Sequence, residues 1–314
     1  MINDSYVVVV GSLNVDLVQT IERLPMPGET LAGGDLRVIP GGKGANQACT
    51  VAKLGGPAAM IGNVGSDPFG ALLLESLRFA GVAVAGVESV GGSSGAASIL
   101  VLPDGENSIV ISGGANARLT GEDVARRIRR LTARIVMCQL EVPMDATESA
   151  LIEARTSGAV TILDPAPAKP LPPAVLSRVD YLTPNQVEAA TLLGVARRIE
   201  TVEDAMDAAL KLLTLGPACV IVKIGRLGCV VATSAGTEWI SGFEVRAVDT
   251  TAAGDVFNGA FAAALAQDRP VREAARIANA AAAISVTRAG AQSSIPSQEE
   301  VERLLENGSM AATS

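Results

Sequence analysis

Histidine is absent from the 314 residues of this chain, and its absence excludes several kinds of active site. A Ser-His-Asp triad, a Cys-His nucleophile pair and a histidine-ligated zinc site all require an imidazole. The chain has 4 cysteines, which are far apart in sequence and form no Cys-x-x-Cys pair: Cys49, Cys138, Cys219 and Cys229. We therefore expect buried, reduced thiols instead of disulfides or metal ligands.

Aromatic residues, positive charge and long apolar runs are also scarce. Aromatic side chains make up 3% of the chain, so the core must be packed mainly with Ala, Val, Leu and Ile. Lys and Arg number 25 against 33 Asp and Glu, a net charge of -8, whereas proteins that bind nucleic-acid backbones are usually basic. No apolar run approaches the length of about 18 residues that spans a membrane, and residues 7–10 are too short for a signal peptide. We expect a cytoplasmic protein that binds neither nucleic acid nor membranes.

Short β-branched runs alternate with helical patterns along most of the chain. The expected strands are residues 7–10, 58–61, 135–138, 160–163, 181–182, 219–223 and 229–232, and the expected helices are residues 43–54, 69–79, 121–131, 145–155, 186–193 and 202–215. Residues 254–287 add two Ala-rich helices. This alternation predicts a doubly wound α/β fold, with a mostly parallel sheet flanked by helices, in which residues 1–314 form one domain.

Two segments, residues 16–40 and 96–112, break that alternation. The first holds several Pro and Gly residues around short extended pieces, and the second alternates like a hairpin that turns at Asp104-Gly105. Together they predict a small β-sheet outside the main one. Such a sheet is either a lid over a cleft or an ordinary surface hairpin, and the pattern alone leaves both open.

Residues 248–255, Val-Asp-Thr-Thr-Ala-Ala-Gly-Asp, combine small residues with a helix start. Unpaired backbone N–H groups at a helix N-terminus carry partial positive charge and can stabilise a phosphoryl group in transfer. Asp255 is then a candidate general base, and the amides of Ala252, Ala253 and Gly254 are a candidate anion hole. The alternative is that Asp255 only caps the helix.

A second glycine-rich stretch, residues 40–48, precedes the first expected helix. Its glycines allow the backbone to approach a ligand closely, and Lys43 and Asn46 lie in the first turn of that helix. It is not a P-loop, because Lys43 is followed by Gly44 and Arg37 stands where the first P-loop glycine belongs. From the pattern alone, a structural turn and a ligand site are equally good interpretations.

Polar residues follow several expected strands at their carboxyl ends, where ligands of open α/β sheets bind. Asn14 and Asp16 follow the first strand, Glu141 and Asp164 follow two later ones, and residues 183–188 place Asn185 and Glu188 after another. Asn and Glu oxygens at such a place are suited to organising waters around Mg²⁺. Taken one at a time, each of these residues is also a common turn former.

Four of these stretches, residues 11–16, 40–48, 185–188 and 249–255, resemble in order and spacing the motifs of the ribokinase-type carbohydrate kinase family. Residues 164–168 and 286–292 add to the similarity, which runs from residue 6 to residue 305. The resemblance implies a ribokinase-like fold and transfer of the γ-phosphoryl group of ATP to the 5-hydroxyl of D-ribose. It also makes Asp255 the base that accepts the hydroxyl proton, and it disfavours the role of a helix cap alone.

The resemblance implies roles for further residues. The sugar would be held by Asn14, Asp16, Gly42, Lys43, Asn46 and Glu141. ATP would be contacted by Asn185, Lys223, Gly225, Arg226, Gly228, Gly254 and Asn279, with Mg²⁺ held through water by Glu188. A monovalent cation, K⁺, would be bound at Asp249, Thr251, Ser285, Arg288, Gly290 and Ser294, partly through backbone carbonyls. A homodimer that pairs through the lid is implied by the same resemblance.

Two departures and several alternatives accompany the resemblance. Lys223 and Asn279 stand where members of the family often carry Thr and His, and we expect catalysis not to depend on them. The two lid segments contain no aromatic residue that would cover a nucleobase, which disfavours a nucleoside kinase. A kinase for 2-deoxyribose, fructose or a sugar phosphate remains an alternative, and a sugar sensor without turnover is a further one.

Overall fold

The computed structural model describes residues 5–196 and 198–308. Its strands are β1 (Tyr6–Val10), β2 (Asn14–Thr20), β3 (Arg37–Gly41), β4 (Ala58–Gly65), β5 (Ala83–Val90), β6 (Gly95–Val101), β7 (Asn107–Ser112), β8 (Ala133–Cys138), β9 (Val160–Leu163), β10 (Tyr181–Leu182), β11 (Cys219–Lys223), β12 (Cys229–Thr233) and β13 (Gly236–Ile240). Its α-helices are α1 (Lys43–Lys53), α2 (Pro68–Phe79), α3 (Gly121–Ile128), α4 (Met144–Ser157), α5 (Pro173–Leu176), α6 (Gln186–Leu193), α7 (Val202–Leu213), α8 (Ala253–Ala266), α9 (Val271–Ser285) and α10 (Gln298–Asn307).

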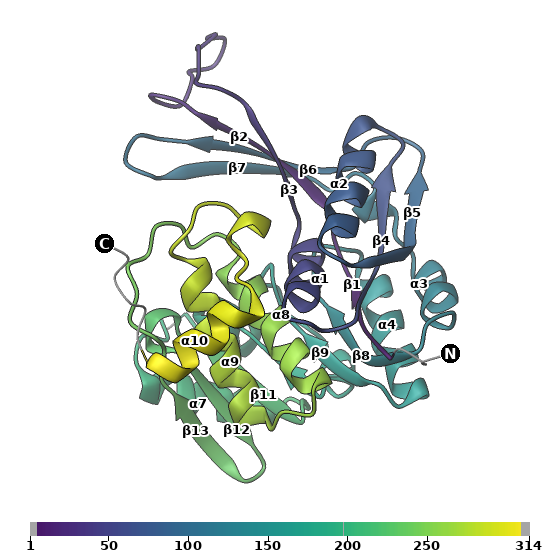
Figure 1. Ribbon diagram of the computed structural model, residues 1–314, viewed down its shortest axis with the longest axis vertical. Helices are drawn as coiled ribbons and strands as arrows, with labels where there is room; N and C mark the ends of the chain where they lie inside the picture. Colours follow the sequence, from purple (N-terminus) through teal and green to yellow (C-terminus); the bar gives the residue numbers. More distant parts are fainter. Residues whose placement is uncertain (1–4, 197, 309–314) are drawn as a thin grey trace.

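The larger sheet has the strand order β13-β12-β11-β10-β9-β8-β1-β4-β5, and its strands from β11 to β5 are parallel. Helices cover both of its faces (Figure 1). A strand buried on both faces needs apolar side chains on both, which explains why β1 is a continuous valine run. Val7 and Val9 pack on one side, and Val8 and Val10 pack on the other. The predicted doubly wound sheet is confirmed.

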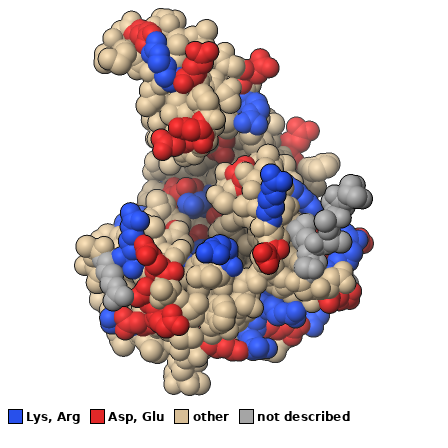
Figure 2. Space-filling model, turned by 90° about the vertical axis from the view of Figure 1, so that its left-hand side faces the viewer, with Lys and Arg blue, Asp and Glu red and all other residues tan. Residues whose placement is uncertain are grey.

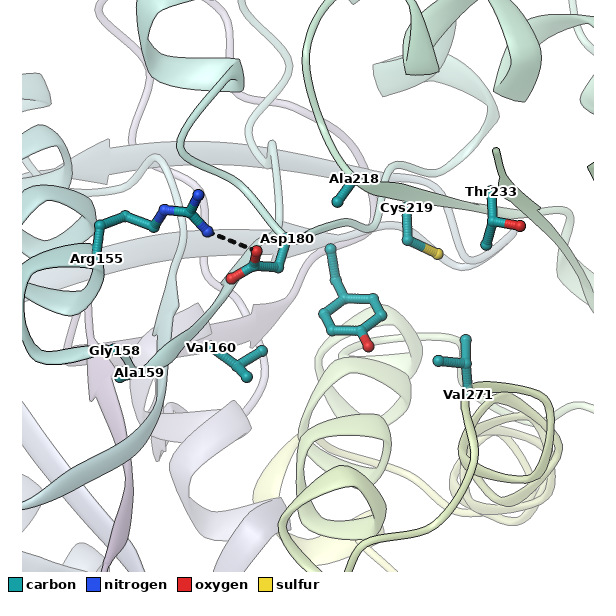
Figure 3. A pocket seen from close by; sticks show the side chains of 10 residues that line it. Arg155, Gly158, Ala159, Val160, Asp180, Ala218, Cys219, Thr233 and Val271 are labelled. Carbon is teal, nitrogen blue, oxygen red and sulfur yellow. Dashed lines mark hydrogen bonds and ion pairs between the residues drawn. The ribbon is translucent and has the colours of Figure 1, made fainter. Parts of the chain in front are cut away.

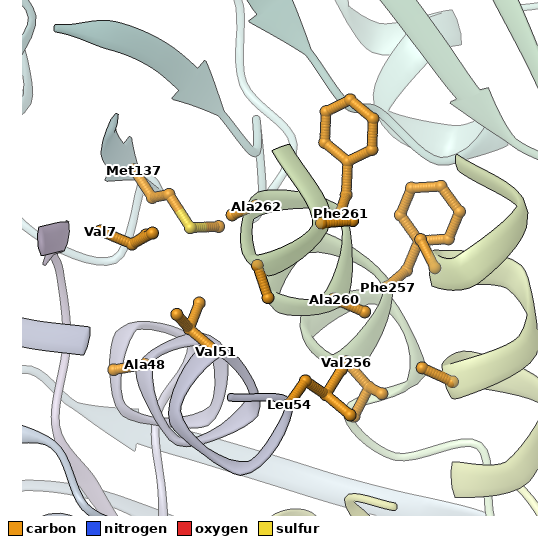
Figure 4. Packing of buried hydrophobic residues seen from close by; sticks show 14 of the residues in the cluster. Val7, Ala48, Val51, Leu54, Met137, Val256, Phe257, Ala260, Phe261 and Ala262 are labelled. Atoms are coloured by element: carbon orange, nitrogen blue, oxygen red, sulfur yellow. The ribbon is translucent and has the colours of Figure 1, made fainter. Parts of the chain in front are cut away.

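One of the two core layers sets the position of the later site, because α1 and α8 pack together against the sheet (Figure 4). Met137 of β8 lies beside Val51 of α1 and Ala262 of α8 in this layer. The helices approach closely at Gly259, where an added Cβ would lie 2.5 Å from Cβ of Thr50. Only glycine fits there. The close approach brings the N-terminal turns of both helices to the same edge of the sheet.

The predicted small sheet exists, with the strand order β3-β2-β6-β7. It projects from one edge of the main sheet over the body of the molecule (Figure 1). Its first strand begins at Asn14 and its third at Gly95, so the lid starts slightly earlier in each segment than the sequence predicted. Asn14 and Asp16 therefore lie on a strand of the lid itself and not in a loop after β1.

Outside the lid, the sequence prediction missed four elements: β5, β13, α10 and the four-residue helix α5. In β5 the burial alternates irregularly around Gly86, so the strand has neither a continuous apolar run nor a clean period of two. The antiparallel edge strand β13 is short and mostly exposed. Helix α10 begins at a capping box formed by Ser297 and Glu300, a signal that was legible in the sequence. Within the described residues, no helix is long and apolar enough to cross a membrane.

Candidate active site

The carboxyl ends of the parallel strands lie beneath the lid. Figure 2 shows the lid rising over the body, with a hollow between them in which acidic and basic side chains meet. Ligands of open α/β sheets bind outside this edge of the sheet. The polar residues predicted at the strand ends come together here.

The glycine-rich stretch before α1 is tied to the end of β1. Ser12 donates from Oγ to Glu141 Oε2 at 2.5 Å, and the backbone N–H of Lys43 donates to the same oxygen at 3.2 Å. Gly42 has a φ of 91°, and an added Cβ would lie 2.7 Å from the backbone nitrogen of Asn14. This glycine is therefore required both by its conformation and by close approach of the lid strand. Glu141 anchors the loop that carries Lys43.

Asn14 and Asp16 lie two residues apart on β2, so both side chains are on the same face of the lid. Asn14 is held by Asn116, which donates from Nδ2 to Asn14 Oδ1 at 2.7 Å and is itself bonded to the backbone of Leu13. Burial and, to a smaller extent, the negative charges of Glu141 and Asp255 together raise the pKa of Asp16 to about 6. A carboxylate in this setting is suited to accepting hydrogen bonds from sugar hydroxyls. Asn116 was not predicted, because it lies in a short 3-10 turn four residues after the end of the lid hairpin and belongs to none of the recognised motifs.

Asp255 is buried in the first turn of α8 and is hydrogen-bonded by α1. Asn46 donates from Nδ2 to Asp255 Oδ2 at 3.0 Å, and Gln47 donates from Nε2 to Asp255 Oδ1 at 3.1 Å. Burial raises the pKa of Asp255, while the positive charge of Lys43 and the two amide hydrogen bonds oppose the rise. A buried carboxylate with a raised pKa and a fixed orientation is a suitable general base.

Gln47 connects Asp255 to a second carboxylate that the sequence prediction did not place in the site. Its Nε2 also donates to Asp164 Oδ2 at 2.9 Å, and its Oε1 accepts from Gln139 Nε2 at 2.6 Å. Gln47, Gln139 and Asp164 are all almost completely buried. Asp164 was recognised only as a polar strand end, and Gln47, one residue after Asn46, carried no separate signal.

The ammonium of Lys43 lies in the field of these carboxylates. The pKa of Lys43 is raised above its usual value, mainly by the charge of Asp255 and further by Asp164, Glu141 and Glu188, although burial opposes the rise. Lys43 is therefore positively charged at neutral pH. It offsets part of the negative charge at the floor of the cleft.

The turn before α8 has the geometry of an anion site. Ala252 has a φ of 60°, a strained conformation for a residue with a Cβ. The N–H of Ala253 donates to the Thr250 carbonyl at 3.3 Å, so this predicted anion-hole amide already has a partner in the turn. The amides of Ala252, Gly254 and Asp255 belong to the first turn of a helix, where N–H groups lack intrahelical acceptors.

Asn185 and Glu188, which the sequence resemblance assigns to ATP and Mg²⁺, form a capping box at the start of α6. Glu188 Oε2 accepts the backbone N–H of Asn185 at 2.7 Å, and Glu188 Oε1 accepts Asn185 Nδ2 at 2.7 Å. Glu188 is buried, which raises its pKa, and the nearby charge of Lys223 opposes the rise. Each carboxylate oxygen keeps a lone pair for a water, so this oxygen-rich place fits a hydrated Mg²⁺.

Of the other residues expected to contact ATP, some are exposed and others are buried and stabilise the neighbouring strand. Gly225 and Arg226 are exposed in a short 3-10 turn. Gly228 has a φ of 94°, and an added Cβ would lie 2.2 Å from the Ile240 carbonyl oxygen. Asn279 is buried and donates from Nδ2 to the same carbonyl at 3.1 Å. Gly228 and Asn279 thus fix the end of β13, a structural role that the sequence did not suggest.

The residues predicted to bind K⁺ come from two segments that meet. Asp249 accepts the backbone N–H of Thr251 at 2.8 Å through Oδ1 and that of Gly290 at 2.8 Å through Oδ2. The hydroxyls of Ser285 and Ser294 are buried and each donates to a carbonyl three residues earlier. The Arg288 side chain instead pairs with Glu300, leaving its backbone carbonyl as the group available to an ion. Oxygen donors on both segments suit a hard cation.

A separate cavity lies at the opposite edge of the main sheet. It has a volume of about 470 Å³ and is lined by the amino ends of β9 to β11 and by parts of α4 and α9. Figure 3 shows Arg155 paired with Asp180 in it, at 2.8 Å. Asp180 also accepts two hydrogen bonds from Thr161. None of the predicted site residues lines this cavity.

An open α/β sheet with a lid, a buried base at a helix N-terminus and a polar strand edge defines a phosphotransferase site. The pfkB family of carbohydrate kinases matches residues 4–298. A ribokinase from Haemophilus influenzae is 40% identical over 95% of this chain and 98% of its own length, and a deoxyribokinase from Salmonella typhi is 36% identical over 95% and 98%. The structure of Arabidopsis thaliana ribokinase with ribose and ATP matches with a TM-score of 0.88 and 35% identity, covering 96% of this chain and 99% of that one.

This chain belongs to the pfkB carbohydrate kinase family, which confirms the resemblance found in its sequence. It is therefore an ATP-dependent phosphotransferase that acts on an alcohol group.

Proposed function

We propose that this protein transfers the γ-phosphoryl group of ATP to O5 of D-ribose, giving D-ribose 5-phosphate and ADP. The observation that carries the proposal is Asp255, a buried carboxylate in the first turn of α8 that Asn46 and Gln47 hold in one orientation. The similarity to ribokinases over nearly the whole chain supports ribose as the acceptor.

In the proposed reaction, Asp255 accepts the proton of the 5-hydroxyl as that oxygen attacks the γ-phosphorus. The bond from phosphorus to the bridging oxygen of ADP breaks in the same step. Such a reaction depends mainly on alignment and on stabilising charge. The amides of Ala252 and Gly254 and the first turn of α8 supply partial positive charge at the transferred group.

The sugar is held from two sides of the cleft. Asn14 and Asp16 approach it from the lid, and Lys43, Asn46 and Gly42 from the floor, with Glu141 fixing the floor loop. The orientation of Asn14 by Asn116 and the raised pKa of Asp16 both support this assignment. Asn185, Lys223, Gly225, Arg226, Gly228, Gly254 and Asn279 are the proposed residues of the nucleotide side.

Two cations complete the proposal. Mg²⁺ supplies charge neutralisation at the ATP phosphates, with Glu188 holding its waters. K⁺ is held by Asp249 and Thr251 on one segment and by Ser285, Arg288, Gly290 and Ser294 on the other. The hydrogen bond from Gly290 to Asp249 supports this grouping, because it places the two segments in contact. An ion there would fix the turn that carries Ala252.

A 2-deoxyribose kinase is the second candidate, because a deoxyribokinase is 36% identical to this chain. Two polar side chains on the lid, Asn14 and Asp16, favour an acceptor with vicinal hydroxyls. A missing hydroxyl would leave one of these polar groups without its partner in the complex, which costs binding free energy. Initial rates on the two sugars decide between the candidates.

The test of the proposed chemistry is Asp255→Asn, which keeps the shape of the side chain and removes the base. We expect the rate of ADP release with ribose to fall about 10³-fold, while ribose and ATP still bind. Calorimetric titration of both ligands measures the binding. A sensor that binds sugar without turnover would show the same binding and no ADP release even in the unsubstituted protein. Turnover that survives Asp255→Asn would contradict the mechanism.

We also propose a homodimer that pairs through the lid. The support is a set of exposed apolar side chains on its strands: Val38 at 43%, Ile109 at 51%, Val110 at 72% and Ile111 at 61% relative exposure. Apolar side chains grouped on one sheet often mark an interface.

A cytoplasmic location is proposed as well. It is supported by four free, buried cysteines, whose burial raises the pKa of each thiol to about 12 and keeps it protonated.

A further inference from the structure

Lys223 and Asp164 form an ion pair at the floor of the cleft. Lys223 ends β11 and Asp164 directly follows β9, and Nζ lies 3.3 Å from Asp164 Oδ1. The two side chains are 11% and 2% exposed. Taking two charges out of water is costly, and a buried pair of this kind is weak evidence for a stabilising role. Its place in the molecule therefore calls for another explanation.

The ammonium of Lys223 lies against the turn that the proposed reaction uses. An added Cβ on Gly254 would be 3.5 Å from Lys223 Nζ, so the charge sits beside the first turn of α8. The backbone of Lys223 also bridges to Asn185, and its charge acts on the buried Glu188. The ammonium thus lies beside the turn proposed to hold the transferred phosphoryl group, and its charge also acts on a residue proposed to hold Mg²⁺.

Asp164 is held rigidly where it meets Lys223. Its other oxygen, Oδ2, accepts the hydrogen bond from Gln47, the same amide that orients Asp255. A lysine ammonium has three donors. Within residues 5–196 and 198–308, Asp164 is its one hydrogen-bond acceptor. The pairing therefore fixes the position of the ammonium and leaves donors for a ligand.

We propose that Lys223 is a catalytic residue whose ammonium contacts the phosphoryl group during transfer, and that Asp164 is the positioning residue that holds the ammonium beside α8. This inference rests on the proposed function. Lys223 forms no covalent bond and moves no proton in the step. Its charge stabilises the negative charge that spreads over the phosphoryl oxygens and the leaving oxygen of ADP. The inference replaces the expectation, drawn from the sequence, that catalysis does not depend on this lysine.

The competing explanation is that Lys223 only neutralises Asp164. Both explanations predict a loss of activity for Lys223→Met, because that change also leaves a buried carboxylate without its partner. They differ for the double variant Lys223→Met with Asp164→Asn, in which the unpaired charge is removed as well. A merely neutralising lysine becomes dispensable in that variant, and a lysine that contacts the phosphoryl group does not.

The test compares wild type, Lys223→Met, Lys223→Arg, Asp164→Asn and the double variant, using the sugar that the wild-type protein phosphorylates fastest. Lys211→Met is the matched control, since Lys211 forms an exposed pair with Asp207 on α7. We expect kcat to fall about 10²-fold in Lys223→Met and equally in the double variant, with ATP dissociation constants nearly unchanged. Lys223→Arg retains part of the rate, Asp164→Asn loses less than Lys223→Met, and the control keeps the wild-type rate. Thermal unfolding confirms that each variant is folded.

A double variant that regains the wild-type kcat would overturn the role of Lys223 and leave the proposed function intact. So would a Lys223→Met variant in which only the affinity for ATP changes. A wild-type protein that phosphorylates another sugar faster than ribose would overturn the ribose assignment alone, because the Lys223 comparison is made on the best acceptor. A wild-type protein that phosphorylates no sugar would overturn both.

Discussion

The two edges of the main sheet carry similar groups in different arrangements. At the amino edge, a cavity of about 470 Å³ contains one ion pair, and Asp180 there accepts hydrogen bonds from Arg155 and Thr161. At the carboxyl edge, Asp255 and Asp164 share a single amide, that of Gln47. Asp180 is bonded to neighbouring side chains and backbone in a way that stabilises the fold. Asp255 and Asp164 instead share a hydrogen-bond donor and lie near ammonium groups, an arrangement typical of a catalytic site.

The comparison also shows why the size of a cavity is a poor guide to this site. The amino-edge cavity has a volume of about 470 Å³, yet none of the predicted site residues lines it. The hollow in which acidic and basic side chains meet lies instead beneath the lid (Figure 2). What distinguishes the cleft is the convergence of residues from α1, α8, the lid and the strand ends. The following variants test whether this convergence, and not the amount of empty space, determines activity.

The largest effect is expected for Gln47→Leu, which removes the shared amide. Asp255 and Asp164 then both lose the hydrogen bond that Gln47 donates, and we expect the free energy of unfolding to fall by about 1–3 kcal/mol. Because the orientation of Asp255 is lost, we expect kcat to fall about 10²-fold. Chemical denaturation and steady-state rates measure the two effects.

Thr50→Val is the control for that variant. Thr50 lies about one turn along the same helix, and among the described residues its hydroxyl donates only to the Asn46 carbonyl. It should change kcat little. Equal losses of rate in Gln47→Leu and Thr50→Val would mean that general loosening of α1, and not the hold on Asp255, limits activity.

The next effect concerns the pH dependence of sugar binding. Asp16 has a pKa of about 6 in the folded protein, and its ionised form is the better acceptor for sugar hydroxyls. We therefore expect KM for ribose to be constant above pH 6 and to rise about tenfold per unit below it. In Asp16→Asn, KM should be high and independent of pH. A wild-type KM that stays flat from pH 5 to 8 would contradict this role.

The same group makes a prediction about stability. The pKa of Asp16 is raised above its ordinary value near 4, so its contribution to stability is fully present below about pH 4 and is lost as the pH rises through 6. Asp16→Asn removes this penalty. The melting temperature of the variant should therefore exceed that of the wild type at pH 8, and the difference should shrink at pH 4.

The next expected effect is on the oligomeric state of the protein. It concerns the lid, which lies over the carboxyl edge of the sheet. Ile109→Lys places a charge among the exposed apolar side chains of β7 and should convert the dimer to monomers in sedimentation velocity. Asn107→Lys adds the same charge to the same face of that strand without removing an apolar group. It should leave the dimer intact. A wild-type protein that sediments as a monomer at all concentrations would rule out the proposed pairing.

The smallest effect is expected at the amino edge. Arg155→Ala breaks an ion pair whose arginine is 53% exposed, which costs at most about 1 kcal/mol. The rate on ribose should be unchanged. A clear loss of kcat in this variant would break the distinction between the two edges.

Much of the main sheet was predictable because its strands are buried on both faces. Residues 160–163 and 219–223 were predicted with the bounds that the structure shows, since a short run dominated by β-branched residues strongly favours a buried strand. The edge strands β5 and β13 were not, because half-exposed strands of irregular pattern resemble loops.

The site was predictable where a motif concentrates it in sequence, and not where it depends on packing. Asp255 and Asn46 stand in recognisable stretches, and the structure brings them to 3.0 Å. Gln47, Asn116 and the pairing of Lys223 with Asp164 depend on which elements meet in space. The contact between Lys223 and Asp164, which are 59 positions apart, was missed because no recognised motif joins the two residues.

The most direct measurement is the initial rate of ADP release with ribose, 2-deoxyribose, fructose, fructose 6-phosphate and adenosine as acceptors, each with and without K⁺. We expect that ribose is phosphorylated fastest, that NMR shows the product's phosphate on O5, and that K⁺ increases the rate. A higher rate on any other acceptor would contradict the assignment of ribose as the substrate.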